Sequence, residues 1–115
     1  MMDNGVMDIV QPDINYNGGF VRTARVARMA RKRSMLITPH STQTGAAAVN
    51  MLHFASATLN IGACMEFPWR QPHEPDSWYS PNFPIRDGVV KVPTGPGLGV
   101  EIDPDFLKRA ERVTL

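Results

Sequence analysis

Asp8-Ile-Val-Gln-Pro-Asp13 is a short apolar run that ends at a proline followed by an ionisable residue. The same plan returns at Met35-Leu-Ile-Thr-Pro-His40, and a third apolar run, Ala63–Met65, ends at Glu66. Each run has the length of a short buried strand, and a proline does not continue a central strand. The sequence therefore predicts three short strands, each with an ionisable side chain at its carboxyl end.

Helices are predicted between these strands. Residues Phe20–Arg33 carry an apolar stripe at helical spacing, formed by Phe20, Ala24, Ala27 and Ala30. Residues Ala46–Leu59 form a second helix that is almost without charge, which indicates burial on most sides. Strands that alternate with helices of this length favour right-handed crossovers and a parallel sheet. We therefore predict an α/β protein.

The three ionisable residues recur at intervals of 26 to 27 residues, close to the ~30 residues that each unit of a (β/α)8 barrel uses. The carboxyl ends of parallel strands meet at one edge, so Asp13, His40 and Glu66 are expected to converge there. Asp13 would fix the tautomer of His40 and make it a proton acceptor, and Glu66 would act as an acid or a hydrogen-bond partner for an enolic oxygen. The alternative is that such residues merely cap turns or helices.

The sequence changes character after Glu66. Residues Phe67–Pro84 contain too many prolines for a helix or a central strand. Ile85–Val92 is predicted to be a hairpin that turns on Asp87-Gly88, and Asp103–Arg112 a terminal helix with Asp103 as its N-cap. We therefore divide the chain into a barrel-like segment, residues 1–66, and a proline-rich extension, residues 67–115.

Composition narrows the choice of function. The formal net charge is +1, which gives no global field for nucleic acid or membrane, and no apolar stretch is long enough to span a bilayer. The single cysteine, Cys64, excludes an internal disulfide and is expected to be buried and inert. A cytoplasmic protein without a signal peptide is expected. Six of the twelve basic residues lie between Arg22 and Arg33, so a small nucleic-acid-binding module remains an alternative.

Several motifs resemble mandelate-racemase-type members of the enolase superfamily. The likeness runs over residues 6–106 in the family's order. Its motifs are Asp8–Asp13 with Gly18-Gly19 and the following helix (the sixth unit), Pro39-His40 (the seventh strand end), Glu66 (the eighth), and the tail from Gly88 to Val100. The resemblance implies the last three βα units of a (β/α)8 barrel, an incomplete barrel, followed by a hairpin, a loop and a short helix.

The resemblance also implies a reaction. In this family a His–Asp pair takes or returns the proton α to a carboxylate of an acid sugar or hydroxy acid, and Mg²⁺ stabilises the enediolate during dehydration or racemisation. Carried over, His40 is the general base or acid, Asp13 its orienting partner, and Glu66 the contact to the enolate or substrate.

The departures from the family pattern shape what we expect of this chain. The family's metal-binding carboxylates, its Lys-x-Lys-type second base and its capping domain have no counterpart here. Three of eight strands cannot close a barrel and leave unpaired edges. We therefore expect a C-terminal fragment that holds no Mg²⁺ ligands and is inactive alone. It would act as a homo-oligomer or beside a complementing chain; a purely structural subunit of a split barrel is a further alternative.

Overall fold

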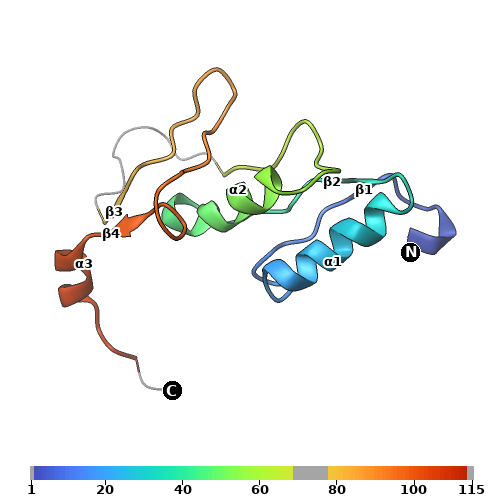
Figure 1. Cartoon of the computed structure of the whole chain (residues 1–115). Coiled ribbons are helices and arrows are strands. Elements are labelled where there is room, and N and C mark those ends of the chain that lie inside the picture. The colour runs from blue at the N-terminus through green and yellow to red at the C-terminus, as the bar shows by residue number, and fades with distance from the viewer. Residues whose placement is uncertain (1, 69–77, 114–115) are drawn as a thin grey trace.

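The computed structural model describes residues 2–68 and 78–113 (Figure 1). A short 3-10 helix, Met2–Asn4, precedes two parallel strands, β1 (Ile9–Val10) and β2 (Leu36–Ile37). Ile9 pairs with Leu36 and Val10 with Ile37. Parallel pairing continues as single bridges at Asp13–His40 and Ile37–Ile61. The predicted α/β organisation is therefore present.

The buried face of α1 (Phe20–Arg31) differs from the predicted stripe. Ala27 and Ala30 are buried as predicted, but the third buried residue is Thr23, and Phe20 is exposed. Residues at these three buried positions lie on one face of a helix, and their small side chains let α1 pack against β2. The helix also ends two residues before the predicted Arg33.

The second helix is buried on most sides, as predicted. Its first turn is a 3-10 helix, Gly45–Ala48, and α2 follows over Val49–Ser56. Five of the eight residues of α2 are buried. The hydrophobic core lies between the two helices and the strands, where α2 contributes Met51, Leu52 and Phe54, and meets Ile14, Ala27 and Ile37.

The prediction of a third strand at Ala63–Met65 is wrong. The pairing lies earlier in the chain: Ile37 N–H donates to Asn60 O over 2.9 Å, and Gly62 N–H donates to Ile37 O over 2.9 Å. A Cβ atom on buried Gly62 would lie 2.5 Å from Thr38 Cγ2, so a larger residue here would displace the Thr38 side chain. Beyond it the chain is irregular, and Cys64 is exposed rather than buried.

The extension contains the predicted hairpin and terminal helix. Arg86 and Val89 exchange two backbone hydrogen bonds of 2.9 Å, and both Asp87 and Gly88 between them have positive φ angles, 51° and 75°. These angles are typical of the type I′ turn that an Asp-Gly pair favours. The helix α3 (Pro104–Arg109) begins after Asp103, whose side chain caps it, and ends three residues before the predicted Arg112.

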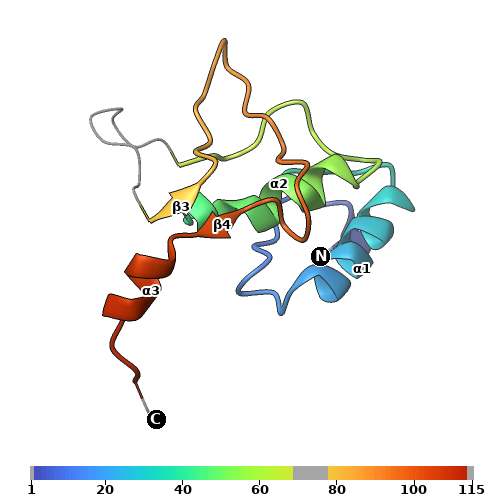
Figure 2. The ribbon, with the colours of Figure 1, turned by 60° about the vertical axis from the view of Figure 1, so that its left-hand side comes forward.

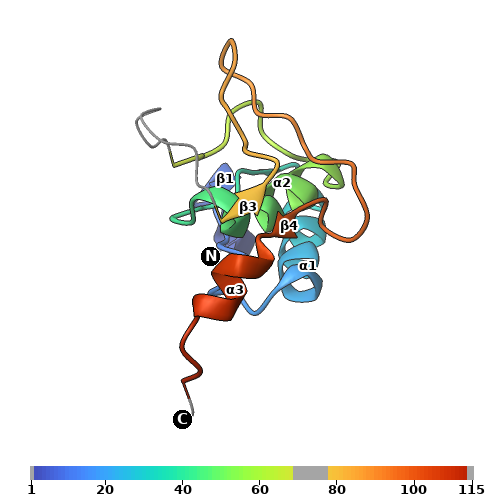
Figure 3. The same cartoon turned by 90° about the vertical axis from the view of Figure 1, so that its left-hand side faces the viewer.

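A small antiparallel sheet in the extension was not predicted. Its strands are β3 (Tyr79–Ser80) and β4 (Glu101–Ile102), which lie side by side near the start of α2 (Figures 2 and 3). Residues 69–77 of the predicted proline-rich loop lie outside the described residues. His53 on α2 makes a 3.0 Å hydrogen bond through Nε2 to Leu98 O, which ties the extension to the helix. No helix in the described ranges has the length and apolarity that crossing a membrane requires.

Candidate active site

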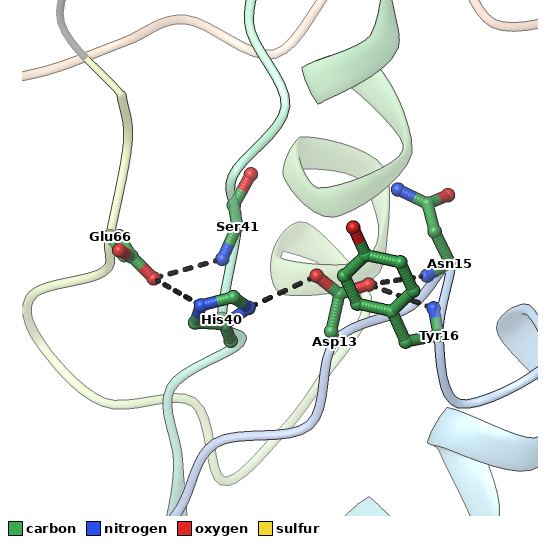
Figure 4. A network of polar contacts seen from close by, with 6 residues as sticks. All are labelled: Asp13, Asn15, Tyr16, His40, Ser41 and Glu66. Carbon is green, nitrogen blue, oxygen red and sulfur yellow. Dashed lines mark hydrogen bonds and ion pairs between the residues drawn. The ribbon is translucent and has the colours of Figure 1, made fainter.

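The three predicted site residues lie close together, Asp13 and His40 just after the paired strands and Glu66 in the irregular segment that follows Gly62 (Figure 4). Asp13 and His40 are paired by the backbone itself, as a parallel bridge. Their side chains also meet, with His40 Nδ1 3.0 Å from Asp13 Oδ2. Glu66 approaches from the other side, and its Oε2 lies 3.7 Å from His40 Nε2. The three side chains therefore converge as predicted and Asp13 contacts His40, but the prediction that Glu66 directly follows a strand is wrong.

Asp13 is a fixed, buried carboxylate whose side chain is 8% exposed. Its Oδ1 accepts hydrogen bonds from the backbone N–H groups of Asn15 at 2.7 Å and of Tyr16 at 3.0 Å. Burial alone raises the pKa of Asp13, but the bonds from Tyr16, His40 and Asn15 outweigh it and hold this pKa below its ordinary value. The carboxylate therefore stays ionised and keeps Oδ2 facing the histidine.

The carboxylate decides how His40 uses its two ring nitrogens. An ionised Asp13 only accepts hydrogen bonds, so Nδ1 of His40 carries the proton and donates it to Oδ2. The other nitrogen, Nε2, is then the basic one in the neutral ring. The side chain is 40% exposed, so the ring is open to solvent. In this geometry Asp13 holds the ring of His40 through Nδ1, and Nε2 is the nitrogen that can accept a proton.

Glu66 is held beside the histidine by the backbone. Its Oε2 accepts a 3.0 Å hydrogen bond from the N–H of Ser41, the residue directly after His40. The carboxylate is 46% exposed and is too far from Nε2 for a direct hydrogen bond. Glu66 can therefore contact a molecule that is bound next to the exposed ring of His40.

Only some of these backbone donors have a signal in the sequence. Residues 15–19, Asn-Tyr-Asn-Gly-Gly, have the composition of a turn, and an aspartate that precedes a turn often accepts from the N–H groups that follow it. The N–H of Ser41 carries no such signal, because any residue except proline supplies one.

The donor set does not fit a magnesium ion. Mg²⁺ requires several oxygen ligands in near-octahedral geometry. Both oxygens of Asp13 already serve hydrogen bonds, one of them to a ring nitrogen, and Glu66 is the remaining carboxylate of the cluster. Within residues 2–68 and 78–113, no group of three His, Cys, Asp or Glu side chains is arranged to hold a metal ion. The arrangement is suited to proton transfer rather than to metal binding.

Comparison with known proteins establishes the family. Residues 1–106 match the family described as enolase C-terminal domain-like, and the chain belongs to it. The chain is 35% identical over 112 residues to D-galactarolactone cycloisomerase of Agrobacterium fabrum, covering 90% of this chain and 29% of that protein. It is 28% identical over 107 residues to arabinonate dehydratase of Saccharolobus solfataricus, covering 89% of this chain and 27% of that protein.

Solved structures agree with this assignment. A member of the enolase superfamily from Polaromonas sp. JS666 superposes with a TM-score of 0.77 and 32% identity, over 98% of this chain and 30% of that one. An enolase from Mycobacterium smegmatis complexed with tartrate superposes with a TM-score of 0.76 and 31% identity, over 93% of this chain and 26% of that one. The chain spans less than a third of the length of each of these four proteins.

Proposed function

We propose that this chain supplies the His–Asp proton-transfer pair of an enolase-superfamily enzyme that acts on an acid sugar or a hydroxy acid. The observation that carries the proposal is the 3.0 Å contact between Asp13 Oδ2 and His40 Nδ1. This contact leaves Nε2 of the partly exposed ring as the base. The relatives support the substrate class, because galactarolactone is the lactone of an acid sugar, arabinonate is itself an acid sugar and tartrate is a hydroxy acid.

In the proposed reaction, His40 Nε2 takes the proton from the carbon α to the substrate's carboxylate. The electron pair of the broken C–H bond moves into the carboxylate and forms an enediolate. Asp13 stabilises the positive charge that the ring acquires. Reprotonation of the α carbon on its opposite face, by an acid that the rest of the enzyme supplies, completes a racemisation, whereas protonation of the β-hydroxyl group and its departure as water completes a dehydration. Glu66 accepts a hydrogen bond from a substrate hydroxyl or from the protonated enolic oxygen.

The enediolate needs a second stabilising element. Electrostatic stabilisation of such an oxyanion is usually the largest contribution to catalysis, and in this family Mg²⁺ supplies it. The cluster of Asp13, His40 and Glu66 does not fit that ion, so we assign metal binding to other residues of the complete enzyme. For this reason the chain alone is expected to be inactive.

The edge of the parallel sheet supports this assembly. The N–H groups of Leu36, Thr38 and His40 donate to carbonyls of alternate residues along β1. In a parallel ladder the residues between them, Ile9 and Gln11, direct their backbone groups to the opposite side. No strand of the described part of the chain lies on that side, and the Ile9 side chain is 50% exposed. We infer that further strands of a (β/α)8 barrel pair here, from a longer polypeptide or from a second chain.

The nucleic-acid alternative is not favoured. The arginines of α1 are exposed on the face away from the core, as expected for an outer helix that faces solvent. The family match covers α1 together with the strands and the site, and the relatives named above are enzymes of small molecules. We therefore do not assign this helix a role in nucleic-acid binding.

The test is complementation. The chain is produced with the part of D-galactarolactone cycloisomerase that lies outside the matched 29%, both as two polypeptides and as one fusion, and is assayed on acid sugars and their lactones. Turnover is expected only when both parts are present. His40→Asn should lower it by roughly 10²–10⁴-fold, the usual contribution of a general base. The matched control is His53→Asn, which alters a histidine of α2 outside the site. Equal turnover with and without His40 would refute the proposal.

A further inference from the structure

We propose that Thr23 and Asn17 are positioning residues that lock the turn carrying Asp13 and so aim its carboxylate at His40. The inference deepens the proposed function, on which its significance for catalysis rests. The contacts described below connect both residues to His40 only through the turn that holds Asp13.

Thr23 is completely buried on the face of α1 that packs against the core. Its hydroxyl group donates a 2.9 Å hydrogen bond to Gly19 O, and its oxygen lies 3.2 Å from Asn17 Nδ2. A carbonyl oxygen can only accept, so the single hydroxyl proton points to Gly19. The Thr23 oxygen therefore accepts from the amide of Asn17. The direction of both bonds is fixed by chemistry.

The same turn is closed by the backbone at both ends. Asn17 N–H donates to Asp13 O over 2.9 Å, and Gly19 N–H donates to Ile14 O over 2.7 Å. Ile14 is buried in the hydrophobic core, which anchors the start of the turn. The Asn17–Thr23 contact anchors its end to the helix.

This turn also supplies the donors that hold the Asp13 side chain. The N–H groups of Asn15 and Tyr16, which grip Oδ1, lie between the two anchored ends. If Asn17 is released from Thr23, these donors move, and the carboxylate rotates with them. A displacement of about 1 Å in a catalytic group is enough to cost roughly 10²-fold in rate. The chain of contacts thus runs from Thr23 through Asn17 to Asp13 and His40.

A buried hydroxyl at position 23 has no packing advantage over a methyl group. Valine has almost the same shape as threonine and fills the same space without a polar atom that must be satisfied. Valine provides neither the acceptor for Asn17 nor the hydroxyl donor to Gly19 O, but Gly19 O still accepts from the Thr23 N–H over 3.1 Å, so the bond without a substitute is the one to Asn17. This difference makes the role of Thr23 testable without emptying the core.

The test reads the tautomer of His40 by NMR in this chain, with no turnover required. Long-range ¹H–¹⁵N spectra of the unaltered chain should show the Nδ1–H form. In Thr23→Val and in Asn17→Ala, His40 should shift toward the mixture of both tautomers. The amides of Asn15 and Tyr16 should exchange about 5- to 10-fold faster, the effect of losing one net hydrogen bond. Thr23→Ser should restore both readings.

The matched control is Thr58→Val. Thr58 makes the same kind of hydroxyl bond to the carbonyl four residues earlier, Phe54 O at 2.6 Å, at the end of α2. This variant should leave the His40 spectrum unchanged. If Thr23→Val does not fold, Asn17→Ala in the surface turn carries the test. An unaltered His40 tautomer in the folded variants would overturn the inference. Failed complementation with an intact tautomer response would instead contradict the proposed function alone.

Discussion

Replacing Asp13 with asparagine tests the orientation of His40 directly. The two N–H groups of Asn15 and Tyr16 require an oxygen at the position of Oδ1, because they lie 2.7 and 3.0 Å from it. The asparagine oxygen must therefore take that place, which turns its NH₂ group toward His40 Nδ1. Two donors cannot face each other, so Nδ1 must lose its proton and accept. The proton then moves to Nε2, which can no longer act as the base.

The expected effects differ in size. The two backbone bonds survive in Asp13→Asn, and one charge-assisted bond becomes a neutral one, so the loss in unfolding free energy is about 1 kcal/mol. Turnover of the complemented enzyme should fall by about 10⁴-fold, as expected when a catalytic histidine is held in the wrong tautomer. A small loss of stability with a large loss of rate is the signature of the proposed geometry.

Three measurements check this prediction. Urea unfolding gives the free-energy change, long-range ¹H–¹⁵N NMR gives the His40 tautomer, and the complementation assay gives the rate. Asp103→Asn is the control, because asparagine is as good an N-cap as aspartate and lies in the extension. Persistence of the Nδ1–H form in Asp13→Asn would show that the carboxylate does not set the tautomer.

Three further predictions follow from the contacts. The pKa of Asp13 is lowered by folding, so its contribution to stability should be present above its ordinary value of 3.8 and be lost as pH falls through the lower folded-state value; pH-dependent unfolding should show this loss, and Asp13→Asn should remove it. Calorimetric titration of the chain with Mg²⁺ should show no stoichiometric site at micromolar affinity, and such a site would contradict our assignment of the metal to other residues. Gly62→Ala should cost about 1–3 kcal/mol of unfolding free energy, because the added Cβ meets Thr38 Cγ2 at 2.5 Å, and Thr38→Ser in the same chain should recover most of it. If the effects of Gly62→Ala and Thr38→Ser on the unfolding free energy simply added, that result would contradict the contact between the two positions.

The position of the site could be predicted from sequence because topology determines it. Asp13 and His40 follow short apolar runs, and parallel strands bring their carboxyl ends together. The hydrogen bonds that hold the side chains of Asp13 and Glu66 could not be predicted. They come from backbone N–H groups at Asn15, Tyr16 and Ser41, and such donors are present at almost every position of any sequence.

The missed strands show where local patterns fail. Ala63–Met65 is the more apolar run, yet pairing occurs at Ile61, next to Gly62, whose lack of a Cβ atom leaves room for the Thr38 side chain. The strand β3 lies in a proline-rich segment, and its partner β4 is far along the chain. Pairing between distant segments leaves no periodicity in either one. The hairpin at Asp87-Gly88 was predictable because its signal is contained in two adjacent residues.

The backbone bridge between Asp13 and His40 has a consequence for how such a protein can evolve. The two residues are neighbours in the sheet ladder, so the spacing of their backbones is set by strand pairing. The turn after Asp13 must be kept, because its N–H groups hold the carboxylate, whereas the segment beyond Ser41 can be lengthened, shortened or exchanged without separating the pair. New substrates can thus be explored by loop variation around an unchanged pair.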